Sequence, residues 1–320
     1  MGSNEGRRLE NLPITLFGSV MGFAGLAIAW LRYEEIMSRH MGVGSVLIHL
    51  TAAWFALLTF FYLAKCLRYP SQVMEEFRHP VRMNFFPAWS ISLLLLGIGF
   101  MEIQPGLARA LWWIGVPLHL LATLRIMSIW IRGDFHIHSL NPAWFIPVVG
   151  TILVPVAGAQ LAHPDISWFF FSVGIVFWIV FMTVVFYRLI FHDPLPEKLL
   201  PTLSILIAPP SVGFIALVKL TGSLDPAGRT LYAFGLFTLL LILGKGARFV
   251  RLPFFVSWWA YTFPLASVTL SSLLMFKLSG TPFYGWLSTG LLALTSLLVL
   301  VVLVQTLAAA RRKEVCVEEA

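Results

Sequence analysis

Ten apolar runs of helical length alternate with short polar segments along the whole chain. A helix needs roughly 18 or more apolar residues to cross about 30 Å of hydrocarbon. Helices are expected because backbone groups in lipid must form hydrogen bonds within their own segment. We predict an all-α integral membrane protein with ten transmembrane helices at residues 14–31, 43–64, 84–103, 106–131, 144–162, 166–188, 199–219, 226–245, 254–276 and 282–307.

Prolines interrupt four of the five odd-numbered spans. Pro87, Pro147, Pro209 and Pro264 recur at intervals of roughly 55 to 62 residues, about one helical hairpin each. A proline kinks a helix, and membranes tolerate such breaks where the backbone is buried or faces water. We therefore predict five repeated helical hairpins, with an inner ring of five kinked odd-numbered helices around a pore and an outer ring of five even-numbered helices.

The first odd-numbered span has glycines where the others have proline. Gly18, Gly22 and Gly25 follow one another at helical spacing. Small residues at this spacing allow two helices to pack closely. They could instead leave a gap for an aromatic ring, and the sequence leaves both roles open.

Composition and charge fix the class of protein and its orientation. The chain is 58% hydrophobic and 12% charged, about half the charged fraction of a soluble domain. Sixteen of its 22 basic residues fall on the side of both termini, so the positive-inside rule predicts cytoplasmic termini in the inner (plasma) membrane. We expect cytoplasmic tails at 1–13 and 308–320 around a single ten-helix domain at 14–307. The net charge of +7 is explained by these loops and not by nucleic acid.

The odd-numbered spans carry no Asp, Glu, Lys, Arg or His within their apolar stretches, 14–31, 84–101, 144–162, 199–218 and 254–276. A proton-coupled carrier is expected to place an arginine and a titratable group there. A passive pore needs neither. The net positive charge and half-helix N-termini favour anions over cations, and weak binding allows fast exit. This pattern favours passive conduction of small inorganic anions such as chloride and nitrate.

Other candidate residues lie outside these stretches. His49 and His119 lie in even-numbered spans, where packing or hydrogen bonding is the commoner role of a histidine. Arg125 either extends to the membrane surface or adds positive potential near the pore mouth. His136 and His138 have no supporting cysteine or carboxylate cluster, so we expect no metal and no cofactor. No nucleophile elbow or phosphate-binding loop indicates an enzyme.

Three segments resemble the SLAC1/TehA family of plant guard-cell anion channels and bacterial tellurite-resistance protein A homologues. Residues 258–264 (WWAYTFP) resemble the family's ninth helix, residues 76–86 (EFRHPVRMNFF) its entry to helix three, and residues 16–22 (LFGSVMG) the start of its first helix. The ten-span layout extends the resemblance over nearly the whole chain.

The resemblance implies a homotrimer in the lipid bilayer, with a pore in each protomer. It also implies a phenylalanine gate on helix nine, which is Phe263 in this chain, directly before Pro264. Pore kinks and lining are then expected at Gly18, Val20, Pro87, Pro147, Pro209 and Pro264. Val20 stands where family members often have proline, so the first span is expected to kink less.

The sequence leaves three functions open. A gated passive anion channel agrees best with the charge-free spans and the expected gate. A secondary transporter or exporter of dicarboxylates, sulfite or tellurium oxyanions is the alternative. A structural or regulatory membrane protein without transport is the third.

Overall fold

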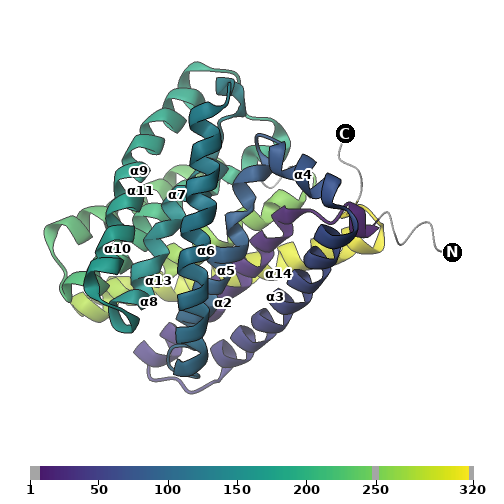
Figure 1. Ribbon diagram of the computed structural model, residues 1–320. Coiled ribbons are helices and arrows are strands. Elements are labelled where there is room, and N and C mark those ends of the chain that lie inside the picture. Colours follow the sequence, from purple (N-terminus) through teal and green to yellow (C-terminus); the bar gives the residue numbers. More distant parts are fainter. Residues whose placement is uncertain (1–7, 247–251, 317–320) are drawn as a thin grey trace.

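The structure, a computed structural model, describes residues 8–246 and 252–316. Within these two ranges every ordered element is helical (Figure 1), and ten spans are long and apolar enough to cross a membrane. This confirms the predicted all-α membrane fold. The spans are Ile14–Ile36, Val43–Arg68, Arg82–Phe100, Pro105–Arg132, Pro142–Leu161, Pro164–Phe191, Glu197–Thr221, Pro226–Leu243, Val256–Ser279 and Pro282–Arg311. The outermost parts of the two predicted tails, 1–7 and 317–320, lie outside the described residues.

Each even-numbered span is one continuous α-helix: α3 (Val43–Arg68), α6 (Pro105–Arg132), α9 (Pro164–Phe191), α11 (Pro226–Leu243) and α14 (Pro282–Arg311). All but α3 begin with a proline, which suits the first turn because its missing N–H has no partner there anyway. Pro117 lies inside α6 without ending that helix. Several helices also run beyond their apolar stretch, as α3 and α14 do, because polar residues continue a helix outside the hydrocarbon.

Each odd-numbered span is built in two or more parts. A 3-10 helix comes first and an α-helix follows: η1 (Ile14–Leu16) with α2 (Phe17–Ile36), η2 (Arg82–Phe85) with α5 (Pro87–Phe100), η6 (Glu197–Ile207) with α10 (Ala208–Thr221), and η7 (Val256–Tyr261) with α13 (Thr262–Ser279). The fifth span alternates twice, as η4 (Pro142–Trp144), α7 (Phe145–Val149), η5 (Gly150–Leu153) and α8 (Val154–Leu161). The short helices α4 (Pro70–Arg78) and η3 (Ile137–Ser139) lie in connections.

The predicted prolines stand close to these changes of helix type. Pro87 begins α5, Pro209 is in the first turn of α10, and Pro264 is in the first turn of α13. Pro147 lies in α7, shortly before η5. The first turn of an α-helix accepts proline without losing a hydrogen bond. The interruptions are therefore junctions between a 3-10 and an α-helical segment.

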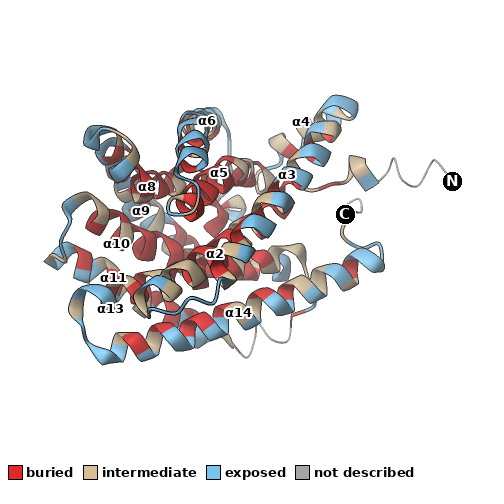
Figure 2. Ribbon diagram, turned by 90° about the horizontal axis from the view of Figure 1, so that it is seen from below, coloured by how far each residue is buried: buried red, intermediate tan, exposed pale blue. Residues whose placement is uncertain are grey.

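Burial separates the two sets of spans. In an apolar 18-residue stretch of each odd-numbered span 67% to 89% of the residues are buried, against 22% to 33% in the even-numbered spans. Figure 2 shows exposed residues along α3 and α14, whereas α2 between them is mostly buried or half-buried. The exposed residues of the even-numbered spans are largely Leu, Ile, Val and Phe, as expected of a surface in contact with lipid.

Each odd-numbered span packs against the even-numbered span that follows it, for example α2 against α3 and α13 against α14. The odd-numbered spans also pack against one another. Helix α2 contacts α5 and α13, while α10 contacts α13 and the η5–α8 segment, which in turn contacts α5. Each buried span therefore has two buried neighbours.

Candidate functional site

Two cavities lie among the buried spans, and all five odd-numbered spans contribute to the lining of each. The first has a volume of about 430 Å³. It opens toward the side of the protein where the first span begins and the last span ends, because Thr15 and Glu314 are part of its lining. We call it the tail-side cavity. The second, of about 280 Å³, lies toward the opposite ends of the spans, and we call it the distal cavity.

Three apolar residues line both cavities and so form the layer between them: Leu153, Val212 and Phe263. They come from three different spans, at the η5–α8 junction, in α10 and at the start of α13. No ionisable side chain of the described residues belongs to this layer. An apolar layer excludes water, and an anion without water is very costly to place in such surroundings.

Phe263 is the second residue of α13 and is followed directly by Pro264. Its ring packs against α2 at Gly25, where an added Cβ would lie 3.2 Å from Phe263 Cδ2 and 2.9 Å from Ala266 Cβ. At Gly22, an added Cβ would lie only 2.1 Å from Thr262 Oγ1. The two roles left open by the sequence therefore coexist, because these glycines bring α2 and α13 close together and Gly25 also leaves space for the ring.

Hydroxyl groups satisfy backbone carbonyls around this turn. The Ser267 Oγ donates to the Pro264 carbonyl over 2.7 Å, and the Thr262 Oγ1 donates to the Trp259 carbonyl over 2.7 Å. Such bonds from side chain to backbone are characteristic of serine and threonine inside helices. They stabilise the junction between η7 and α13 that carries Phe263.

The other residues predicted from the sequence divide into two groups. Gly18, Pro209 and Pro264 line the tail-side cavity. Val20, Pro87 and Pro147 are buried but belong to the lining of neither cavity, because they pack among the helices.

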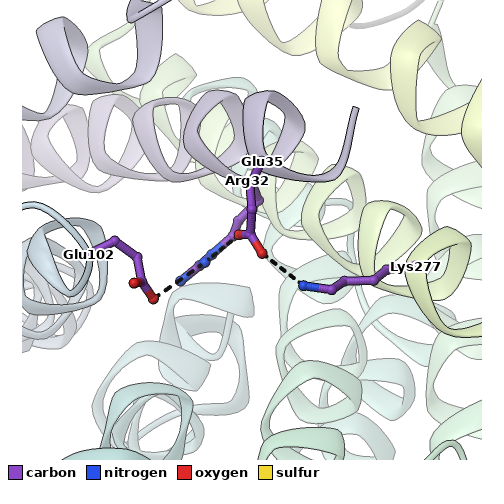
Figure 3. A network of polar contacts seen from close by, with 4 residues as sticks. All are labelled: Arg32, Glu35, Glu102 and Lys277. Carbon is purple, nitrogen blue, oxygen red and sulfur yellow. Dashed lines mark hydrogen bonds and ion pairs between the residues drawn. The ribbon is translucent and has the colours of Figure 1, made fainter. Parts of the chain in front are cut away.

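A network of charged side chains borders the distal cavity (Figure 3). Arg32 Nη1 donates to Glu35 Oε2 over 2.6 Å, and Lys277 Nζ donates to Glu35 Oε1 over 2.8 Å. Glu102 Oε1 lies 3.9 Å from Arg32 Nη1. The side chains of Arg32 and Glu35 are 24% and 43% exposed, so this ion pair belongs to the mouth of the cavity and not to the layer around Phe263.

The sequence contained a signal for the charged side chains that line the distal cavity. Arg32, Glu102, Lys219 and Lys277 each follow directly after one of the uncharged stretches 14–31, 84–101, 199–218 and 254–276. All four line the distal cavity. Counting charges by loop assigns such residues to solvent and misses that they gather at one opening.

A second charged group is buried away from both cavities. Glu76 of α4 accepts hydrogen bonds from Lys65 Nζ (2.9 Å), the Tyr62 hydroxyl (2.8 Å) and the Ile14 backbone N–H (2.6 Å). Lys65 Nζ also donates to the Leu12 carbonyl over 2.8 Å. The Lys65 and Glu76 side chains are only 4% and 5% exposed. This cluster joins α3 and α4 to the start of the first span.

The C-terminal segment turns back after α14. Lys313 has a φ of 66°, and the Glu314 N–H donates to the Ala309 carbonyl. Glu314 and Val315 then line the tail-side cavity, and Cys316 packs on the hydrophobic core. Burial raises the pKa of the Cys316 thiol above its usual value, although the nearby positive charges of Arg8 and Lys65 act to lower it.

Neither cavity is lined by the histidines singled out from the sequence, His49, His119, His136 and His138, or by Arg125. His119 is fully buried, with its Nδ1 3.0 Å from the Ser90 Oγ, and its ring fills the space beside Gly150. The His49 Nδ1 lies 2.7 Å from the Ser45 carbonyl, and Arg125 is exposed on α6. Within residues 8–246 and 252–316, no group of three or more His, Cys, Asp or Glu side chains could hold a metal ion.

A protein-family model described as voltage-dependent anion channel, SLAC1, matches residues 11–307. The chain belongs to the SLAC1 family. The match includes all ten spans up to the last turn of α14, so the resemblance inferred from three short segments is confirmed.

Curated relatives of this SLAC1-family chain include channels and transporters. It is 30% identical to the S-type anion channel SLAH2 of Arabidopsis thaliana over 83% of its length, but spans only 53% of that protein. It is 29% identical to the tellurite resistance protein TehA homolog of Haemophilus influenzae, covering 82% of this chain and 80% of the relative. An uncharacterized transporter of Methanocaldococcus jannaschii is 27% identical, with 93% and 95% covered. The family and these names support a role in anion transport across a membrane.

Proposed function

We propose that the protein is a gated passive channel for small monovalent anions such as chloride and nitrate. The observation that carries the proposal is that all five buried spans line two cavities separated by one thin apolar layer. Among the described residues that line each cavity, Lys and Arg outnumber Asp and Glu by one: Arg82 and Lys198 against Glu314 in the tail-side cavity, and Arg32, Lys219 and Lys277 against Glu35 and Glu102 in the distal cavity. This excess attracts anions, while the layer lacks the fixed charges that would bind an anion tightly and slow its exit.

In this proposal Phe263 is the gate. Its ring is bulky and apolar, and it faces both cavities at the junction of two helix types. Removing the ring would join the two cavities and allow water into the layer. A hydrated path removes the main cost of moving an anion through an apolar interior.

The test compares Phe263→Ala with wild type in planar lipid bilayers, with chloride, nitrate and malate supplied in turn. The matched control is Phe276→Ala, which removes a ring of the same size from the same helix, where it packs against Gly285 and lines neither cavity. We expect Phe263→Ala to raise the chloride and nitrate currents strongly and the control to behave as wild type. A correctly folded Phe263→Ala protein with no more current than wild type would contradict the gate.

A secondary transporter or exporter of dicarboxylates, sulfite or tellurium oxyanions is the second candidate. Two observations favour it: the ion-pair network at the distal cavity and the description of two relatives as transporters. It predicts saturable flux into liposomes that depends on a pH gradient. Anion flux that follows only the electrochemical gradient of the anion favours the channel.

We further propose that the protein forms a homotrimer in the inner (plasma) membrane, with both termini in the cytoplasm and a separate path in each protomer. Under this orientation the tail-side cavity opens to the cytoplasm and the distal cavity to the outside. The excess of basic residues on the tail side supports it. Native mass spectrometry tests the oligomeric state, and labelling of single cysteines at either end of α14 in intact cells tests the orientation.

A further inference from the structure

Among the described residues, the lining of the distal cavity has one more positive than negative side chain. Three basic side chains line it, from Arg32, Lys219 and Lys277, together with the carboxylates of Glu35 and Glu102. Arg32 and Lys277 both bond to Glu35, and Glu102 is within ion-pair distance of Arg32, as Figure 3 shows. These four side chains balance one another, so the excess charge belongs to Lys219.

Lys219 stands apart from this network. It lies in the last turn of α10 and is half-buried. Among the described residues, none of the ion pairs and none of the hydrogen bonds of the distal cavity involves its ammonium group. Lysine is seldom withdrawn from water without a partner. A half-buried ammonium group that lines a cavity, with no carboxylate of the described residues within 4.0 Å, is therefore available to a mobile anion.

The position of Lys219 suits an entry site. It comes two turns after Val212, which belongs to the apolar layer, and both residues line the distal cavity. Gln160 of α8 lines the same cavity and adds amide N–H donors. A cavity with low-dielectric walls concentrates the field of a single charge and raises the local concentration of its counter-ion.

We propose that the distal cavity is an anion-binding site centred on Lys219, which holds a small monovalent anion such as chloride or nitrate before it enters the apolar layer. The role in entry rests on the proposed channel function, whereas the binding itself does not. One excess positive charge matches one monovalent anion. The carboxylates of Glu35 and Glu102 keep the binding weak, so the anion is released readily.

Binding is measured first, because it does not depend on conduction. The line width of chlorine-35 in nuclear magnetic resonance reports chloride bound to purified protein in detergent. We expect Lys219→Gln and Lys219→Met to lower the apparent chloride affinity about fivefold, the effect of one charge a few ångströms away in a wet site. Lys219→Arg should keep the affinity, and nitrate should compete with chloride.

Arg229→Gln is the matched control for this measurement. Arg229 is an exposed basic residue in the first turn of the next helix, on the same side of the protein, and it lines neither cavity. It should leave the chloride signal unchanged. The site would be overturned if both neutral Lys219 variants gave the wild-type chloride signal, or if Arg229→Gln lowered the chloride affinity as much as they do. Lys219 would then be a side chain that only extends to water.

Conduction is measured second, in a Phe263→Ala background. At about 10 mM salt, Lys219→Gln should reduce anion current entering from the distal side about fivefold, and at about 1 M salt the difference should vanish because the charge is screened. An unchanged current at low salt would overturn the entry role. If the background itself does not conduct, the channel proposal fails, and the binding result still decides the site.

Discussion

Replacing Lys65 with methionine should destabilise the protein more than the loss of any ion pair at its surface. The long apolar stem is kept, so the change removes the charge and two hydrogen bonds, to Glu76 and to the Leu12 carbonyl. The Glu76 carboxylate, which is only 5% exposed, then loses the cation that it pairs with. Leaving a buried charge uncompensated costs about 3–5 kcal/mol.

A double-mutant cycle separates the pair from its surroundings. Glu76→Gln alone leaves the Lys65 ammonium buried without its counter-charge, so it should cost a similar amount. The combination of both changes leaves no buried charge and should cost less than the sum of the two single changes. We expect the difference to be about 1.5 kcal/mol or more, as found for contacting residues in one network.

Unfolding of the purified protein by SDS in mixed micelles measures these free energies. Lys277→Met is the control, since it breaks an ion pair with Glu35 in which the two side chains are 52% and 43% exposed. Such a pair is worth at most about 1 kcal/mol. A Lys65→Met protein as stable as this control, or single changes that simply add, would refute the reasoning.

Two further predictions concern the packing of the gate and the docked C-terminal segment. Gly25→Ala should lower the free energy of unfolding by about 1–3 kcal/mol, because the new methyl group must push α13 and the Phe263 ring away from α2. Gly290→Ala is the control: its new methyl group has no neighbouring atom within 4 Å, so it should be neutral or stabilising in the same SDS titration. The second prediction uses a Cys66→Ser protein, in which mass spectrometry follows the alkylation of Cys316 by iodoacetamide. The rate of alkylation should increase only at a pH above the range in which an ordinary thiol ionises. The raised pKa leaves less thiolate at any given pH, and a rate equal to that of the denatured chain would contradict the docked position.

The sequence predicted the spans well because membrane thickness fixes the length of an apolar helix. It also indicated which spans are buried, since prolines and glycines inside a span require neighbours that satisfy the exposed backbone. The two-part construction could not be predicted, because one proline is compatible with a kink, a helix start or a 3-10 segment. Pro87 and Pro264 prove to be in the first turns of α-helices.

The charged groups were harder to predict than the helices. Lys65 is one of the sixteen basic residues that the sequence places on the side of the termini, but α3 continues to Arg68 and brings Lys65 to a buried partner on α4. The apolar layer also depends on side chains far apart in the sequence. Leu153 and Val212 are ordinary core residues by type, and only the packing of three spans brings them to Phe263.

In four of the five buried spans, a 3-10 segment on the tail side is followed by one α-helix. A 3-10 helix rises about 2.0 Å and turns about 120° per residue, whereas an α-helix rises about 1.5 Å and turns about 100°. Rewinding the six residues of η7 as α-helix would shorten that segment by about 3 Å and rotate one end against the other by about 120°. Phe263 lies two residues beyond this segment. A change of η7 from 3-10 to α-helix would therefore rotate the Phe263 ring, while the later part of α13 that lines the distal cavity keeps its position.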